Sequence, residues 1–270
     1  MPEGLLPVFA AILNALFLVG SIYIYLALVR QIGARTEDER AVPVRTFGMP
    51  DVFAAGALGT LFLFSAFAAI SQTNRAALSG SDLPANAVIA AGLFLFIAGF
   101  LRVRGIDVGA LAGFGKLQFW RTLGTGFILL FAAYPLIFVA DLVTQRVLGG
   151  SSSKQNIVEL FSGSETLQQR VLIIILAVAI APIVEEFVFR FYFYGVVKRY
   201  FGRFAGLLVN SLLFAVVHGH VPSAAPLFVL GVCFTLAYEW SGSILVAMTM
   251  HALFNSLTLT ALAFPDLVAQ

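Results

Sequence analysis

Long apolar stretches, each about as long as a bilayer is thick, follow one another along this chain with short polar connections between them. The hydrocarbon core of a bilayer is about 30 Å thick, and an α-helix needs about 20 apolar residues to cross it. The third stretch is the weakest, because only residues 87–101 of it are clearly apolar. The pattern predicts eight transmembrane helices, at residues 5–29, 51–71, 83–101, 122–143, 171–197, 203–220, 222–238 and 243–263.

The composition agrees with this pattern. Of the 270 residues 60% are hydrophobic and 11% are charged, whereas soluble domains contain about 25% charged residues. No internal repeat divides the chain. We therefore expect an all-α fold, a polytopic membrane helix bundle that forms one integrated unit. The net charge is only +2, and no broad basic surface of the kind that nucleic acids require is present, so a nucleic-acid partner is excluded.

Basic residues are distributed unevenly over the connections between the predicted helices. Lysine and arginine accumulate in the cytoplasmic connections of membrane proteins. Eleven of the 16 lie after the first, third and fifth helices, all on one side, four lie on the other side, and Arg190 lies within the fifth helix. This bias predicts that both termini are outside and that the fifth helix runs inward. The eleven are Arg30, Arg35, Arg40, Arg45, Arg102, Arg104, Lys116, Arg121, Lys198, Arg199 and Arg203, and the four are Arg75, Arg146, Lys154 and Arg170.

The fifth predicted helix contains the segment "APIVEEFVFRF", with three ionisable residues in apolar surroundings. Each such residue costs about 2.5–3.5 kcal/mol at the centre of a membrane helix. Glu186 and Arg190 are four residues apart and share a helix face, whereas Glu185 is rotated by about 100°. We predict that Glu186 neutralises Arg190 while Glu185 faces a cavity, and that Pro182 kinks the helix and admits water. A buried ion network that only locks helix packing is the alternative.

Two later helices carry further polar side chains. His218 ends the sixth helix, while His220 lies about 200° round from it and is expected in an interfacial loop. His251 and Asn255 are four residues apart in the eighth helix and share a face, where they could also form a simple interhelical hydrogen-bonding pair. At a rise of about 1.5 Å per residue, these side chains and Glu185 occupy overlapping layers of the bilayer.

A carboxylate and two imidazoles in a dry cavity can hold a water molecule, remove its proton and direct it to a carbonyl carbon. His251 and Asn255 could then donate hydrogen bonds to the oxyanion of the tetrahedral intermediate. This chemistry is peptide-bond hydrolysis. The set Glu185, His218 and His251 would also suffice as ligands of a catalytic zinc with an open fourth position. Both schemes for activating water remain open at this stage.

The segments "APIVEEFVFR", "FAVVH" and "HALFN" resemble, in order and spacing, the EExxxR, FxxxH and HxxxN motifs of the CPBP family. This family comprises CAAX proteases and bacteriocin-processing enzymes, which are intramembrane glutamic proteases or metalloproteases. The resemblance covers residues 167–263 and implies an eight-helix bundle with a conical cavity, open to the cytosol in the CAAX enzymes. It also implies a set of site residues, with Glu185 as base or ligand: Glu185, Glu186, Arg190, His218, His251 and Asn255.

The resemblance implies an intramembrane endopeptidase of the bacterial inner membrane that cleaves a membrane-associated protein or peptide, lipidated or near its C-terminus. One divalent metal, zinc at Glu185, His218 and His251, is implied only if the enzyme uses a metal. Residues 1–166 are transmembrane helices to which no motif assigns a role. Phe191 stands where many members have glycine after the motif arginine, and we expect it to narrow the cavity.

Two other functions fit parts of the sequence. A non-enzymatic immunity or scaffold protein of the same family would keep the bundle and bind a membrane partner, and the loss of a motif residue would favour it. None is missing. A transporter or proton relay could use the same ionisable residues. Against it, these residues cluster in one layer instead of crossing the bilayer, and no inverted repeat is evident.

Overall fold

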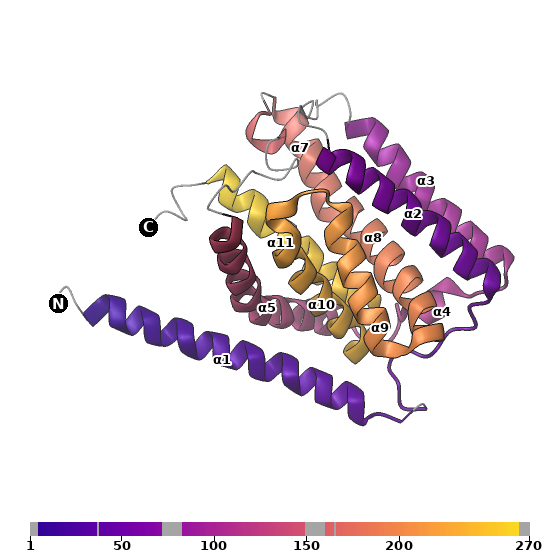
Figure 1. Ribbon diagram of the computed structural model, residues 1–270, viewed down its shortest axis with the longest axis horizontal. Coiled ribbons are helices and arrows are strands. Elements are labelled where there is room, and N and C mark those ends of the chain that lie inside the picture. Colours follow the sequence, from indigo (N-terminus) through magenta and orange to yellow (C-terminus); the bar gives the residue numbers. More distant parts are fainter. Residues whose placement is uncertain (1–4, 37, 72–82, 149–159, 165, 265–270) are drawn as a thin grey trace.

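The computed structural model describes residues 5–36, 38–71, 83–148, 160–164 and 166–264, and all the regular secondary structure of these residues is helical (Figure 1). This confirms the all-α membrane bundle. The long helices are α1 (Leu5–Ala34), α2 (Met49–Ser71), α3 (Leu83–Val103), α5 (Phe119–Leu148), α9 (Tyr194–Val217), α10 (Ala224–Ser241) and α11 (Ile244–Ala263). The shorter elements are α4 (Val108–Ala112), α7 (Leu167–Ile175), α8 (Ala181–Glu186), the π-helical η2 (Leu176–Ile180) and η3 (Phe187–Phe193), and the 3₁₀ turn η4 (Val221–Ser223).

Seven helical stretches of the described residues are long and apolar enough to cross a membrane. One of them, residues 167–217, has 51 residues and would be about 75 Å long if straight, more than twice the thickness of the bilayer core. Gly202 interrupts it with φ 83° and ψ 173°, a backbone conformation that glycine adopts without steric cost. Beyond it Gly206 packs against Tyr194 and Lys198. The stretch is therefore folded back into two arms, which accounts for the fifth and sixth predicted helices.

The third predicted helix, the weakest in the apolar pattern, is continuous as α3 and extends from residue 83 to residue 103. Helices α1 and α5 also extend beyond their predicted bounds, because their polar ends continue the helical winding, whereas α9 ends at Val217, before the predicted residue 220. With the stretch 167–217 counted as two arms, the seven stretches of the described residues correspond in order to the eight predicted helices.

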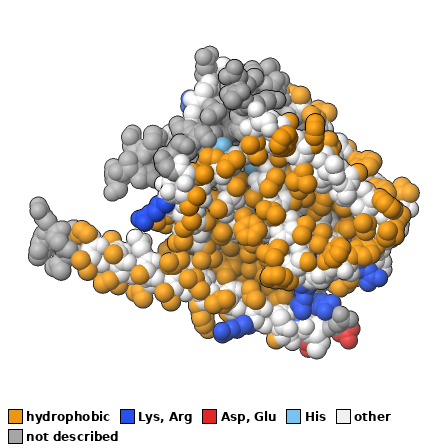
Figure 2. Space-filling view, viewed as in Figure 1, with side chains coloured by type: hydrophobic (Ala, Val, Ile, Leu, Met, Phe, Trp, Pro, Cys, Tyr) orange, Lys and Arg blue, Asp and Glu red, His pale blue; other side chains and the backbone are white. Residues whose placement is uncertain are grey.

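The second arm of α9 and helices α5, α10 and α11 form the centre of the bundle, with α10 in contact with the other three. Helix α1 lies along one edge against α5 and α10, and α2 and α3 lie on the opposite side, next to α9, α8 and η3 (Figure 1). The core is rich in aromatic side chains, and Phe187, Phe214 and Phe234 are almost completely buried. The face of the bundle that Figure 2 shows is mostly hydrophobic, as lipid contact requires.

Three connections meet at one end of the bundle: residues 35–48, residues 104–118 and the turn at Gly202. Here Arg203 donates to the Ile32 carbonyl at 2.6 Å, and Lys198 donates to the Val42 carbonyl at 2.7 Å. In Figure 2 most of the visible Lys and Arg atoms lie along the lower edge of the molecule, which is this end of the bundle. We call this end the basic end. The predicted clustering of basic residues is confirmed. Which side of the membrane this end faces stays a prediction. Arg75 and Lys154, which were predicted on the opposite side, lie outside the described residues.

Candidate active site

The helix that carries the two glutamates is wound irregularly on both sides of them. Helix α8 lies between the π-helical segments η2 and η3, and such segments occur often at functional sites. Pro182 has no amide hydrogen, and the Ala181 amide donates to the Leu176 carbonyl, five residues back. The carbonyl of Ala177 is thereby left for a side chain, and Asn255 Nδ2 donates to it at 2.7 Å. The kink expected at Pro182 thus takes the form of π-helical winding braced from α11.

Glu186 occupies the dry side of this helix and is fully buried. Its Oε1 accepts a hydrogen bond from Arg190 Nη1 at 3.0 Å and lies 2.8 Å from His251 Nδ1. The guanidinium carbon of Arg190 lies 4.2 Å from the centre of the Phe214 ring, so aromatic faces compensate the buried cation. The pairing expected from the spacing of Glu186 and Arg190 is confirmed, and it extends to a histidine of another helix.

Glu185 points in a different direction. Its side chain is 30% exposed, and Oε2 lies 4.0 Å from His218 Nε2 and 3.9 Å from His251 Nε2. These separations exceed a direct hydrogen bond and are short enough for one water molecule to contact all three groups. The structure therefore brings Glu185, His218 and His251 together from three helices, as the overlapping layers predicted.

The other ring nitrogen of each histidine fixes the tautomer. His218 Nδ1 lies 2.7 Å from the Phe214 carbonyl oxygen, which can only accept, so Nδ1 carries the hydrogen. His251 Nδ1 faces the Glu186 carboxylate and donates for the same reason. In the neutral form of both imidazoles the lone pair is therefore on Nε2, the nitrogen that faces Glu185.

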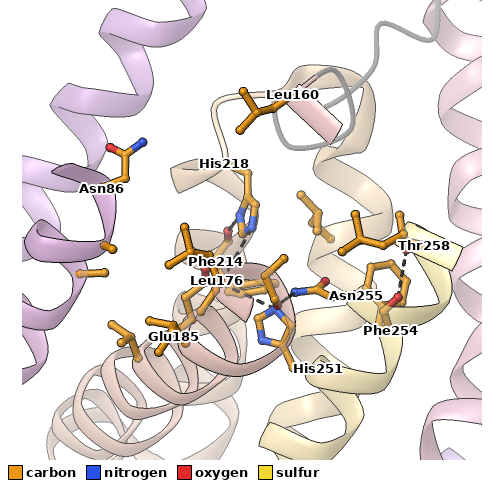
Figure 3. A pocket seen from close by; sticks show the side chains of 18 of the residues that line it. Asn86, Leu160, Leu176, Glu185, Phe214, His218, His251, Phe254, Asn255 and Thr258 are labelled. Carbon is orange, nitrogen blue, oxygen red and sulfur yellow. Dashed lines mark hydrogen bonds and ion pairs between the residues drawn. The ribbon is translucent and has the colours of Figure 1, made fainter. Parts of the chain in front are cut away.

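These groups form the polar floor of a cavity of about 380 Å³ (Figure 3). Its walls are apolar side chains from α3, η2, α10 and α11, among them Ala90, Leu176, Leu230 and Phe254. Asn255 also lines the cavity. All three residues whose chemistry suits hydrolysis, Glu185, His218 and His251, therefore border one space large enough for part of a peptide.

No sequence motif pointed to α3, yet its first two turns contribute Leu83, Asn86, Ala87 and Ala90 to the cavity wall. Asn86 lies across from the histidines and is labelled in Figure 3. The only signal in the sequence was a polar amide near the start of an otherwise apolar stretch, and that signal alone also fits a solvated helix end. Residues 1–166 thus supply part of the site.

His220 and Phe191 lie away from the cavity. His220 pairs with Ser223 Oγ at 2.7 Å and is 6% exposed, so it is buried beside η4 instead of lying open at the interface. Phe191 is fully buried, and its ring centre lies 3.9 Å from the guanidinium carbon of Arg45. The expectation that Phe191 narrows the cavity is wrong, because η3 directs this ring toward the connection 35–48.

The cavity lies toward the end of the bundle opposite the basic end. Its lining includes the first turns of α3 and α10 and the second half of α11. At the other end of α3 follows Arg104, and near the end of α10 Arg35 donates to the Trp240 carbonyl. The positive-inside rule assigns the basic end to the cytoplasm, and the family resemblance implies a cavity open to the cytosol. The sidedness of the cavity therefore stays a prediction, which labelling from the two sides of the membrane can test.

The three candidate ligands do not match a zinc site as they stand. Tetrahedral zinc with bonds of about 2.0–2.2 Å places neighbouring ligand atoms about 3.3 Å apart. The Glu185 carboxylate lies 4.0 and 3.9 Å from the two imidazole nitrogens. Within the described part of the chain, no group of three histidine, cysteine or carboxylate side chains is close enough to hold a metal ion.

The fold and this site define a class: a membrane helix bundle with a glutamate and two histidines at the floor of an intramembrane cavity. Residues 167–257 match the model of the Rce1-like type II CAAX prenyl endopeptidase family. This match confirms the CPBP resemblance over these residues, which include all six predicted site residues.

The chain is also similar to the membrane-embedded CAAX protease MroQ of Staphylococcus aureus (strain USA300). The two are 27% identical over 143 residues, which make up 50% of this chain and 54% of MroQ. The match thus spans about half the length of this curated relative. No solved structure matches the chain.

Proposed function

We propose that this protein is an intramembrane endopeptidase that hydrolyses a peptide bond of a membrane-associated substrate. The observation that carries the proposal is the convergence of Glu185 Oε2 with His218 Nε2 and His251 Nε2, at 4.0 and 3.9 Å, on the floor of the cavity. The family match over residues 167–257 and the similarity to a CAAX protease support it.

In the proposed reaction a water molecule binds between Glu185 and the two imidazoles. Glu185 removes one proton, and the oxygen attacks the carbonyl carbon of the scissile bond. Because both Nε2 atoms are acceptors in the neutral rings, His218 can orient the second hydrogen of the water. Loss of the water proton and formation of the new C–O bond produce a tetrahedral intermediate with a negative oxygen.

His251 is suited to carry to the leaving amine the proton that Glu185 has removed. Its Nε2 accepts this proton and gives it to the amine nitrogen as the C–N bond breaks and the carbonyl re-forms. Its Nδ1 donates to Glu186, and a carboxylate in this position orients the ring and stabilises the imidazolium form. Asn255 uses one amide hydrogen on Ala177, and its second hydrogen remains for the developing oxyanion.

The cavity walls indicate the kind of substrate. Apart from Glu185 and the histidines, the lining side chains of the described residues are apolar or are the uncharged Asn86, Asn255 and Thr258. A charged substrate side chain would lose its hydration there without a partner. We therefore propose that the residues beside the scissile bond are apolar, as in a membrane-inserted segment or a lipidated end.

Comparing membranes with the wild-type protein and with Glu185→Gln tests this proposal. Mass spectrometry of new peptide ends should find cleavage sites with apolar flanking residues only in the wild-type membranes, while Glu185→Gln should co-purify with the uncleaved substrates. Identical peptide ends in both membranes would contradict the proposal. Capture of the same partner by both variants without cleavage would point to the scaffold function.

Two histidines of the same connection provide a matched pair for this test. His218→Ala should abolish the wild-type cleavages, because it removes one nitrogen of the water site. His220→Ala removes a side chain that bonds to Ser223 outside the cavity and should leave these cleavages in place. Equal effects of the two substitutions would contradict the assigned site.

A further inference from the structure

The connection 35–48 inserts one arginine into the core beside the glutamate-bearing helix. Arg45 is 3% exposed, and its Nη1 donates to the carbonyl of Phe191, in η3, at 2.7 Å. The same guanidinium stacks on the Phe191 ring with 3.9 Å from its carbon to the ring centre. One cation thus contacts both the backbone and the side chain of a single residue of η3.

The remaining contacts of Arg45 show a site shaped for this side chain. Its Nη2 donates to the Tyr238 hydroxyl and, at 3.4 Å, to the Leu111 carbonyl. A methyl group at Gly195 would overlap Arg45 and Phe47, so the glycine makes room for the arginine. No carboxylate of the described residues forms an ion pair with Arg45. Carbonyl dipoles and aromatic faces therefore compensate its charge, which makes the backbone of η3 part of its binding site.

Phe191 connects this arginine to the glutamates. Its ring stacks on that of Phe187, with centres 5.1 Å apart and planes inclined by 12°, and Phe187 directly follows Glu186. At the other end of α8, Asn255 holds the Ala177 carbonyl of η2 at 2.7 Å. Helix α8 is thus held at both ends by side chains from elsewhere in the chain, Asn255 on η2 and Arg45 on η3.

We propose that Arg45 is a positioning residue that fixes the rotation of the helix segment carrying Glu185 and Glu186. The proposal rests on the proposed function and gives the connection 35–48, which lies outside the family match, a role in catalysis. Rotation of α8 moves Glu185 relative to the two imidazoles, and a displacement of about 1 Å can cost about 100-fold in rate. Binding of the substrate to the apolar walls depends less on this rotation.

Kinetics on a peptide that the wild-type protein cleaves, with Arg45→Met, Arg45→Lys and Lys116→Met, test this role. Lys116 is the matched control, because it donates to the Ala41 carbonyl of the same connection and forms no hydrogen bond or ion pair with η3 among the described residues. Arg45→Met should lower kcat about 10- to 100-fold with KM little changed, since only the positions of the reacting groups shift. Arg45→Lys should give an intermediate kcat, and Lys116→Met should keep that of the wild type.

Hydrogen exchange supplies a readout that does not depend on activity. Amides of residues 187–195 should exchange faster in Arg45→Met than in Lys116→Met. Wild-type kcat in Arg45→Met, or an equal loss in Lys116→Met, would overturn the proposal. If Arg45→Met does not fold, Arg45→Lys must still lower kcat more than Lys116→Met, and equal values would overturn it.

Glu185→Gln, measured alongside, separates the two proposals. An active Glu185→Gln contradicts the proposed function itself. An inactive Glu185→Gln together with wild-type kcat in Arg45→Met contradicts only the positioning role.

Discussion

Glu186 and His251, 65 residues apart in the sequence, are joined across two helices by a contact of 2.8 Å between Oε1 and Nδ1. The same oxygen accepts from Arg190. One buried carboxylate therefore compensates a cation of its own helix and orients an imidazole of another, which leaves Glu185 to face the cavity. The adjacent glutamates have different partners because consecutive residues of a helix point in directions about 100° apart.

The Glu186–Arg190 pair should show strong coupling in stability. Either Glu186→Gln or Arg190→Met leaves one buried charge without its partner, which costs about 3–5 kcal/mol. The double variant removes both charges and should regain most of this free energy of unfolding, while hydrolysis stays impaired. Chemical unfolding in detergent micelles measures all three. A double variant as unstable as the sum of the single changes would show that the pair is not a coupled unit.

Asn255 and Pro182 should be coupled through the Ala177 carbonyl. Asn255→Ala leaves this carbonyl without its side-chain donor, and an unsatisfied buried polar group costs about 1–3 kcal/mol. Pro182→Ala supplies an amide hydrogen to the same turn, so Asn255→Ala should cost less stability in a Pro182→Ala background. The same loss in both backgrounds, again from unfolding in micelles, would contradict the brace.

Metal removal should leave hydrolysis unchanged. The separations of 4.0 and 3.9 Å between Glu185 and the imidazoles are wider than the spacing of about 3.3 Å between ligands of tetrahedral zinc. Purified protein treated with a chelator should therefore retain its activity, and elemental analysis should find less than one zinc per chain. A stoichiometric metal whose removal abolishes cleavage would show that the site contracts around an ion.

Labelling of cysteines introduced one at a time determines which end of the bundle faces the cytoplasm. Asp38, at the basic end, and Gln168, at the opposite end, are both exposed, and the only native cysteine, Cys233, is buried. From the positive-inside rule we predict that an impermeant maleimide labels Gln168→Cys but not Asp38→Cys in intact cells. The reverse result would place the cavity end in the cytoplasm, as the family resemblance implies for CAAX enzymes.

The helices could be predicted from the length of the apolar stretches. The different directions of Glu185 and Glu186 could be predicted from the period of the helix. The reversal at Gly202 was also predictable, since the apolar run 167–217 is too long for one crossing. Motif spacing placed His218 and His251 near Glu185, and the distances of 4.0 and 3.9 Å agree.

The contacts of Arg45, Phe191 and Asn86 could not be predicted in the same way. They depend on packing between segments far apart in the chain, such as the bond from Arg45 to a carbonyl 146 residues away. The π-helical winding around α8 also shifts the direction of side chains after Glu186 from that of a regular helix. Phe191 consequently faces Arg45, whereas its position in the motif alone had predicted that it lines the cavity.

The rate of peptide hydrolysis by purified Glu185→Gln tests the central claim most directly. Glutamine keeps the size of the side chain and cannot take the proton of water, so we predict a loss of about 10²–10⁴-fold in kcat, the usual contribution of a general base. Asp141→Asn, an acid-to-amide change in α5 outside the cavity lining, serves as the control and should retain the wild-type rate. A Glu185→Gln variant that cleaves the peptide as fast as this control would contradict the account.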